Sequence, residues 1–173
     1  MKQSEKQKTV LLGLSGGVDS SVAALLLKKQ GYNVIAVFMK NFSDIKNPLT
    51  KECNYLEDKK IAQKIAAILN IPILILNFEK EYKKYVIEPM FDAYKNGLTP
   101  NPDIVCNKII KFPLLWKKAE TIKADYIATG HYARIKEKSE GYQLLSGKDK
   151  TKDQSYFLSE LSQSDLSHTH FSQ

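Results

Sequence analysis

A short glycine-rich segment near the N-terminus constrains the fold more than any other part of this sequence. Residues 9–14 predict a buried strand, residues 15–17 (Ser-Gly-Gly) a tight turn, and a helix is expected to begin near Asp19 or Ser20. Paired glycines let backbone N–H groups curl around an anion, and a helix N-terminus adds unpaired donors and partial positive charge. An ordinary strand-to-helix turn needs fewer polar residues than this one carries. The segment therefore predicts a phosphate-binding loop.

The loop differs from the two best-known phosphate-binding motifs. No Gly-Lys-Ser/Thr follows the glycines, as in a Walker A loop, and the spacing is not the G-x-G-x-x-G of dinucleotide-binding loops. The segment SGGVDSS instead resembles the pyrophosphate-binding loop of the ATP pyrophosphatases, which split ATP between its α- and β-phosphates. In such a loop Ser15, Ser20 and Ser21 supply hydroxyl donors, and Asp19 is the candidate ligand for a Mg²⁺ ion that accompanies pyrophosphate.

The apolar pattern predicts a doubly wound α/β domain. Four runs are expected to be strands (residues 9–14, 33–39, 72–78 and 125–130), with helices near residues 20–30 and 57–69 and two more between 80 and 123. The first three runs lack alternation, as is typical of a parallel sheet that is buried on both faces. Ligands bind such sheets beyond the carboxyl ends of the strands, where residues 15–20, 39–41 and 130–131 all fall.

The C-terminal part has a different pattern. Residues 134–138 and 142–146 predict a hairpin, and a short helix around residues 154–161 is expected to precede a polar tail. We therefore expect a nucleotide-binding domain over residues 1–135 and the start of a small hairpin and helix appendage over residues 136–173.

Composition places the chain among ordinary globular proteins. It has 173 residues, of which 43% are hydrophobic, and no apolar run reaches the roughly 20 residues that span a bilayer. We expect a cytoplasmic protein that is not associated with a membrane, because the N-terminus is polar and does not resemble a signal peptide. The net charge of +7 suits a polyanionic partner, although scattered lysines are equally compatible with a solvated surface.

A second segment, TPNPDIVCN at residues 99–107, carries candidate chemistry. Its two prolines stiffen the backbone, so Asp103 and Cys106 are held in a fixed relation. We expect Cys106 to lie just before a helix, where the helix N-terminus lowers the pKa of the thiol and favours the thiolate. Asp103 is interpreted as a proton shuttle or as a helix cap, and a buried structural cysteine is the alternative for Cys106.

Four segments taken together resemble the bacterial tRNA-specific 2-thiouridylases (the MnmA/TrmU family). They are the phosphate loop, TPNPDIVCN, IATGHYARI at residues 127–135 and GKDKTKDQSYFLSEL at residues 147–161. The phosphate loop alone is shared by many ATP pyrophosphatases, whereas NPD-x-x-CN together with KDQSYFL narrows the resemblance to this family. The resemblance extends over nearly the whole chain and implies the adenine nucleotide alpha hydrolase-like fold.

The resemblance implies 2-thiolation of the wobble uridine of tRNA. In the family, ATP adenylates the uracil C2 oxygen, a cysteine persulfide delivers sulfur, AMP leaves and two cysteines end as a disulfide. The implied cofactors are ATP and Mg²⁺, and the implied partners are tRNA and a persulfide sulfur donor protein.

The resemblance also assigns roles to residues. Cys106 matches the nucleophilic cysteine, with Asp103 as the acid/base. The residues implied in ATP binding are Gly13, Leu14, Ser15, Gly16, Gly17, Val18, Asp19, Ser20, Met39 and Gly130. Those implied in tRNA contact are Asn101, Pro102, Asp103, Lys152, Asp153 and Gln154.

The sequence departs from the family pattern in one respect that matters for activity. The persulfide-carrying cysteine of the family lies in a later part of its chains, followed by β-rich domains, and this sequence ends at Gln173 with neither. Cys53 matches a different family position and is expected to be a loop or packing cysteine. We therefore expect a fragment or a truncated gene product in which thiolation is incomplete.

Two other functions stay open at this point. An ATP pyrophosphatase acting on a small molecule, such as an amide-forming ligase, would share the loop but leave TPNPDIVCN unexplained. A non-catalytic nucleotide- or tRNA-binding remnant is compatible with the missing cysteine.

The remaining notable side chains have less specific interpretations. His131 either lines the nucleotide site or makes a structural hydrogen bond. No metal is expected at His168 and His170, because no cysteine or carboxylate pair lies near them in sequence. Phe112 and Trp116 stand at helical spacing and are expected in the core.

Overall fold

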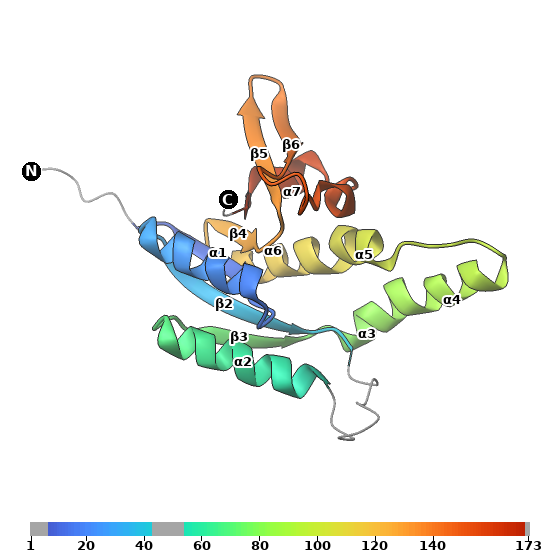
Figure 1. Cartoon of the computed structure of the whole chain (residues 1–173), viewed down its shortest axis with the longest axis horizontal. Coiled ribbons are helices and arrows are strands. Elements are labelled where there is room, and N and C mark those ends of the chain that lie inside the picture. Colours follow the sequence, from blue (N-terminus) through green and yellow to red (C-terminus); the bar gives the residue numbers. More distant parts are fainter. Residues whose placement is uncertain (1–6, 43–53, 172–173) are drawn as a thin grey trace, which may run out of the picture.

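A parallel five-stranded sheet forms the centre of the molecule (Figure 1). The computed structural model describes residues 7–42 and 54–171. The strands lie in the order β3-β2-β1-β4-β7, and every neighbouring pair is parallel. Their bounds are β1 Thr9–Gly13, β2 Asn33–Lys40, β3 Ile73–Asn77, β4 Tyr126–Thr129 and β7 Thr169–Phe171. The chain builds outward from β1 through β2 and β3, then returns to β4 on the other side, so the strand order reverses beside β1.

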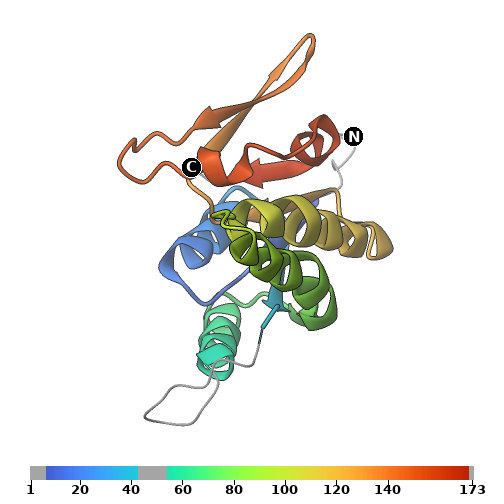
Figure 2. The same cartoon turned by 90° about the vertical axis from the view of Figure 1, so that its right-hand side faces the viewer.

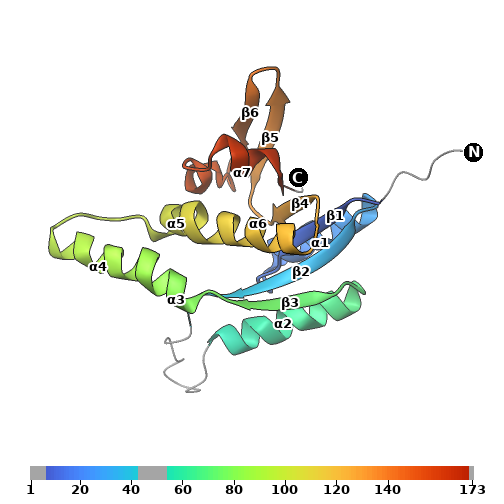
Figure 3. The ribbon, with the colours of Figure 1, turned by 180° about the vertical axis from the view of Figure 1, so that it is seen from behind.

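Helices cover both faces of the sheet, which confirms the doubly wound α/β prediction. On one face, Val10 and Leu12 of β1 pack against α1 (Val18–Lys29), while Ala36 of β2 packs against α2 (Asn54–Ile68). On the other face, Leu11 packs against α6 (Phe112–Thr121). Figure 3 shows the molecule from this opposite side. Within the described ranges, no helix is both long and apolar enough to cross a membrane.

Burial of the strands matches the prediction only in part. β1 and most of β2 are buried on both faces, as the uninterrupted apolar runs predicted. The prediction was wrong for β3, because β3 is an edge strand and Ile75 keeps 41% of its surface exposed. An apolar run cannot distinguish an edge strand from a central one, since the distinction depends on neighbours that come later in the chain.

The two helices predicted between residues 80 and 123 are present, and each contains a π-helical turn. The first runs through α3 (Glu79–Tyr82), a π-helical segment η1 (Lys83–Ile87) and α4 (Glu88–Lys95). The second runs through α5 (Pro102–Val105), a π-helical segment η2 (Cys106–Lys111) and α6. The second helix begins at Pro102, so the connection between the two helices covers only residues 96–101.

The C-terminal part forms a hairpin that projects from the sheet and then returns to it (Figure 2). β5 (Ala133–Lys138) and β6 (Gly141–Ser146) pair in antiparallel fashion, which confirms the predicted hairpin. The helix expected around residues 154–161 is a short 3₁₀ turn, η3 (Ser155–Leu158).

The prediction that a polar tail without regular structure follows residue 161 was wrong. A helix, α7 (Gln163–Ser167), begins with a capping box between Ser162 and Asp165, and β7 then pairs with β4. The domain boundary after residue 135 stays a prediction, although β7 places the end of the second segment in the sheet of the first.

Some predictions fall on residues that the structure does not describe. These are the interpretation of Cys53 as a loop or packing cysteine and the polar segment 1–6. The prediction that Phe112 and Trp116 belong to the core is confirmed, with Phe112 fully buried and Trp116 packed against the same cluster.

Replacing Ile127 by alanine tests the placement of β4 inside the sheet, between β1 and β7. Ile127 is fully buried between α6 and the neighbouring strands, so Ile127→Ala should lower the free energy of unfolding by about 2–5 kcal/mol. Urea unfolding followed by circular dichroism measures the change. The matched control is Ile75→Ala on the edge strand β3, which should cost clearly less because that side chain is already 41% exposed. Equal losses in the two variants would contradict this fold.

Candidate functional site

A cavity of about 490 Å³ opens at the carboxyl ends of the parallel strands, beside the point where the strand order reverses. Its wall is formed by the segments that follow β1, β2 and β4, which the sequence predicted to lie together, and by side chains from α2 and η2. The size lies within the range of small-molecule sites. Among the residues implied in ATP binding, the cavity is lined by Gly13, Leu14, Ser15, Asp19, Ser20, Met39 and Gly130.

Close backbone packing holds the loop between β1 and α1. Gly16 has φ +89°, and a Cβ there would lie 2.7 Å from the Asp58 backbone oxygen of α2. A Cβ at Gly130 would lie 2.6 Å from the backbone nitrogen of Ser20. Both positions need glycine, because a side chain would push backbone away from backbone. The first turn of α1 therefore lies directly on the end of β4.

The helix begins slightly earlier than predicted. Gly17 is the N-cap of α1 and Val18 is its first residue, so the start predicted near Asp19 or Ser20 is confirmed to within one residue, although no side chain caps the helix. The serine hydroxyls bond within the loop instead. Ser20 Oγ accepts from Ser15 N at 3.2 Å and donates to Gly17 O at 3.1 Å, while Ser21 Oγ donates to the same carbonyl at 2.6 Å. The loop is thus shaped by its own hydroxyls, with Ser15 Oγ 3.0 Å from Ser20 Oγ.

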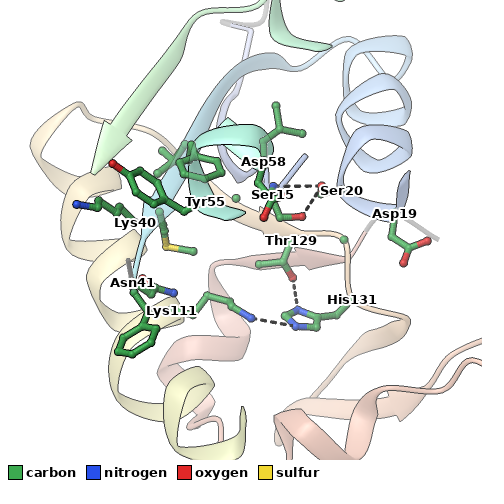
Figure 4. A pocket seen from close by; sticks show the side chains of 17 residues that line it. Ser15, Asp19, Ser20, Lys40, Asn41, Tyr55, Asp58, Lys111, Thr129 and His131 are labelled. Atoms are coloured by element: carbon green, nitrogen blue, oxygen red, sulfur yellow. Dashed lines mark hydrogen bonds between the residues drawn. The ribbon is translucent and has the colours of Figure 1, made fainter. Parts of the chain in front are cut away.

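Asp19 lies at the edge of the cavity (Figure 4). Through Tyr132, Asp19 is linked to the segment that contains Lys152 and Gln154. The Tyr132 hydroxyl donates to Asp19 Oδ1 at 3.0 Å. The Tyr132 backbone is in turn bonded twice to Gln154, at 3.1 and 2.9 Å, and the Lys152 ammonium lies over the Tyr132 ring. Lys152 and Gln154, which the resemblance implies in tRNA contact, are therefore held beside the phosphate loop by their contacts with Tyr132. The sequence alone did not predict this proximity.

Asp153 shapes its own turn. Its carboxylate accepts hydrogen bonds from Gly147 N and from the backbone and hydroxyl of Ser155. These bonds lower the pKa of Asp153, because they favour the charged carboxylate.

A chain of polar contacts runs along the cavity through Lys111, His131 and Thr129. The sequence did not predict that these residues lie together. Lys111 Nζ lies 3.4 Å from His131 Nε2, and His131 Nδ1 lies 2.7 Å from Thr129 Oγ1 (Figure 4). Burial, helped by the nearby Lys111 charge, lowers the pKa of His131 to about 3. The imidazole is therefore neutral, with Nε2 accepting from Lys111 and Nδ1–H donating to Thr129. Both interpretations of His131 hold, since it lines the cavity and makes a structural hydrogen bond.

Cys106 does not have the helix-start setting that the sequence predicted. The helix begins at Pro102, where Asn101 Oδ1 caps the backbone N–H groups of Asp103 and Ile104 at 3.1 and 3.3 Å. Cys106 is therefore a full turn inside the helix, and its side chain is only 7% exposed. Burial raises the pKa of the thiol, and the Lys111 charge opposes that rise. The expected activation by a helix N-terminus was wrong, because the prolines and Asn101 start the helix four residues earlier.

The Cys106 segment adjoins the cavity. Cys106 and Tyr82 belong to one buried cluster, and the Tyr82 ring lies 6.4 Å from that of Phe42, which lines the cavity. Asp103 is exposed on the preceding turn. The cavity lining includes neither Cys106 nor Asp103, and the segment that bears them lies beside the cavity, at the same end of the sheet as the residues implied in ATP binding.

The described part of the chain contains no cluster of three or more His, Cys, Asp or Glu side chains arranged to hold a metal ion. His168 stacks on Trp116 with ring centroids 3.7 Å apart, and His170 packs edge-on against Tyr126 at 4.3 Å. Both histidines are packing residues of β7 and its approach. Asp19 is the acidic residue that the cavity and the phosphate loop share.

The parallel sheet, its flanking helices and the cavity beside the glycine-rich loop at the topological switch point are the architecture of an α/β nucleotide-binding domain. The family model described as the tRNA methyl transferase HUP domain matches residues 8–173, and the chain belongs to that family.

Curated relatives match nearly all of the chain. The tRNA-specific 2-thiouridylase MnmA of Christiangramia forsetii is 50% identical over 168 residues, covering 95% of this chain and 42% of the relative. The protein of the same name from Shouchella clausii is 48% identical over 171 residues, covering 99% of this chain and 46% of the relative. The chain thus spans less than half the length of these relatives. Among solved structures, NMN synthetase from Francisella tularensis is similar over 70% of this chain and 44% of its own, with a TM-score of 0.48 and 22% identity.

Replacing His131 by asparagine tests whether this imidazole is buried in its neutral form. A folded-state pKa of about 3, against about 6.5 when unfolded, gives stability that is complete above pH 6.5 and is lost as the pH falls toward 3. Urea unfolding at successive pH values should therefore show a loss of up to about 1.4 kcal/mol per pH unit from His131 below pH 6.5. In His131→Asn this part of the slope should vanish. His168 and His170 remain in both proteins, so the difference isolates His131, and identical slopes would disprove the assignment.

Proposed function

We propose that this chain is the ATP-binding and uridine-adenylating part of a tRNA 2-thiouridylase. The observation that carries the proposal is the juxtaposition of two elements at one end of the sheet: a phosphate loop without a Walker lysine, and the helix that bears Asp103 and Cys106. The names of the similar proteins support tRNA as the substrate class and 2-thiolation as the reaction.

The position of the glycine-rich loop suggests the orientation of ATP in the cavity. The phosphates bind the backbone N–H groups and hydroxyls of residues 15–20, at the N-terminus of α1, where the helix dipole favours negative charge. The adenine end lies toward Met39 at the end of β2. Asp19 supplies a carboxylate for Mg²⁺, an ion usually held by one or two carboxylates together with substrate phosphates. When bound, Mg²⁺ neutralises phosphate charge.

The uridine binds between the cavity and the start of α5. Its C2 oxygen attacks the α-phosphorus of ATP, so that pyrophosphate leaves and the oxygen becomes part of an AMP leaving group. The terminal sulfur of a cysteine persulfide then attacks C2 and displaces AMP, which carries away the former C2 oxygen and leaves the uridine joined to the carrier cysteine through an S–S bond. The Cys106 thiolate attacks the sulfur of the carrier cysteine, forms a disulfide with it and releases the 2-thiouridine. Asp103, exposed beside Cys106, acts as the acid/base, and Cys106 acts as the nucleophilic cysteine. A persulfide on a separate donor protein is the proposed source of sulfur.

The basic segment after the hairpin is the proposed tRNA contact. Lys148, Lys150 and Lys152 are exposed there, next to the phosphate loop, and the chain carries a net charge of +7. Such lysines attract the phosphate backbone of RNA without reading its sequence, so they position the anticodon while residues 101–103 contact the base.

Product analysis tests this function directly. With ATP labelled at the α-phosphate, the chain should release pyrophosphate and transfer the labelled AMP group to a tRNA that has uridine at the wobble position. The matched control is the same tRNA with cytidine there, which should leave ATP unchanged. Mass spectrometry of the tRNA should detect the adenylated uridine. Formation of ADP and phosphate, or equal turnover with both tRNAs, would contradict the proposal.

A further inference from the structure

Lys111 occupies the boundary between the nucleotide cavity and the Cys106 segment. Its side chain lines the cavity and reaches to His131, with Nζ 3.4 Å from Nε2 (Figure 4). Its backbone lies at the end of η2, the π-helical segment that begins at Cys106. One lysine thus belongs to both halves of the site.

The π-helical turn explains how one residue can face both halves. Hydrogen bonding from residue i to residue i+5 widens the turn, so residues five positions apart come onto the same side of the helix. Cys106 and Lys111 stand five positions apart within η2. In a regular α-helix they would point in clearly different directions. The Lys111 charge acts on the Cys106 thiol, and the Lys111 backbone N–H also favours the thiolate.

The charge of Lys111 is not neutralised by its contacts in this structure. Its hydrogen-bond partner His131 is a neutral imidazole. Across residues 7–42 and 54–171, no ion pair joins Lys111 to a carboxylate. Burial lowers the pKa of Lys111, which shows that its surroundings disfavour an uncompensated cation. A cation held in a cavity in this way is arranged to receive an anion.

We propose that Lys111 is an anion-binding residue at the junction of the site, whose ammonium binds a phosphate oxygen of the nucleotide and attracts the Cys106 sulfur from the same position. It supplies the positive charge that a Walker lysine supplies elsewhere, but from a distant helix instead of from the loop. The nucleotide's identity in this inference rests on the proposed function.

The other groups that face Cys106 cannot take this role. They are Asp103 from α5 and Tyr82 from α3, an acid and a phenol, neither of which carries positive charge. His131 is neutral and contacts the lysine. Lys111 is therefore the group in this cluster whose charge favours the thiolate.

The test combines ATP affinity with the reactivity of Cys106. All variants carry Cys53→Ser, so that Cys106 is the one thiol left of the two in the sequence. Lys111→Met removes the charge while keeping the bulk, Lys111→Arg keeps the charge, and Lys117→Met removes an exposed lysine from the same helix as a control. ATP affinity is measured by calorimetry, and alkylation of Cys106 by iodoacetamide is followed from about pH 6 to 10.

Lys111→Met should weaken ATP binding by about tenfold or more and move the midpoint of the alkylation profile to higher pH. Lys111→Arg should retain most of both properties, and Lys117→Met should match the parent. If the parent binds ATP and Lys111→Met keeps both the affinity and the profile, the inference is overturned. If the parent itself does not bind ATP, the proposed function fails instead, and the alkylation profile still decides whether Lys111 attracts the sulfur. Thermal unfolding of each variant identifies any that fail to fold.

Discussion

The direct contact between Gly130 and the first turn of α1 is the constraint on which the site depends. No side chain separates the end of β4 from the start of α1, since a Cβ at Gly130 would lie within 2.8 Å of three backbone atoms of Asp19 and Ser20. This contact fixes the helix N-terminus beside the ends of β1 and β4. The phosphate loop, the cavity and the position of Asp19 all follow from it.

A second constraint joins the chemistry of Cys106 to that cavity. Pro102 and the Asn101 cap start the helix early, so Cys106 is buried inside it instead of standing at its N-terminus. The π-helical turn then directs Lys111 back toward the cavity. A thiol that burial makes less acidic is therefore paired with a cation that makes it more acidic, and the balance responds to any anion that binds the lysine.

Local sequence was enough to predict the elements that depend on local physics. The apolar runs, the glycine pair and the hairpin turn each act within a few residues, and β1, β4 and the β5–β6 hairpin lie where they were expected. Contacts between distant segments were not predictable in this way. The strand β7 has three residues and is stabilised by pairing with β4 and by stacking of His168 on Trp116. The position of Lys111 in the cavity could not be predicted from the sequence, because a π-helical turn breaks the 3.6-residue period by which residues are assigned to helix faces.

The central claim is that the close packing at Gly130 creates the nucleotide site. The decisive measurement is the ATP affinity of Gly130→Ala by calorimetry, with circular dichroism recorded on the same samples. The added methyl group must displace the first turn of α1, because backbone atoms block it on that side. The account predicts a folded protein whose ATP affinity falls by about tenfold or more, equivalent to a loss of about 1.4 kcal/mol. A folded variant that binds ATP as tightly as the parent would contradict it.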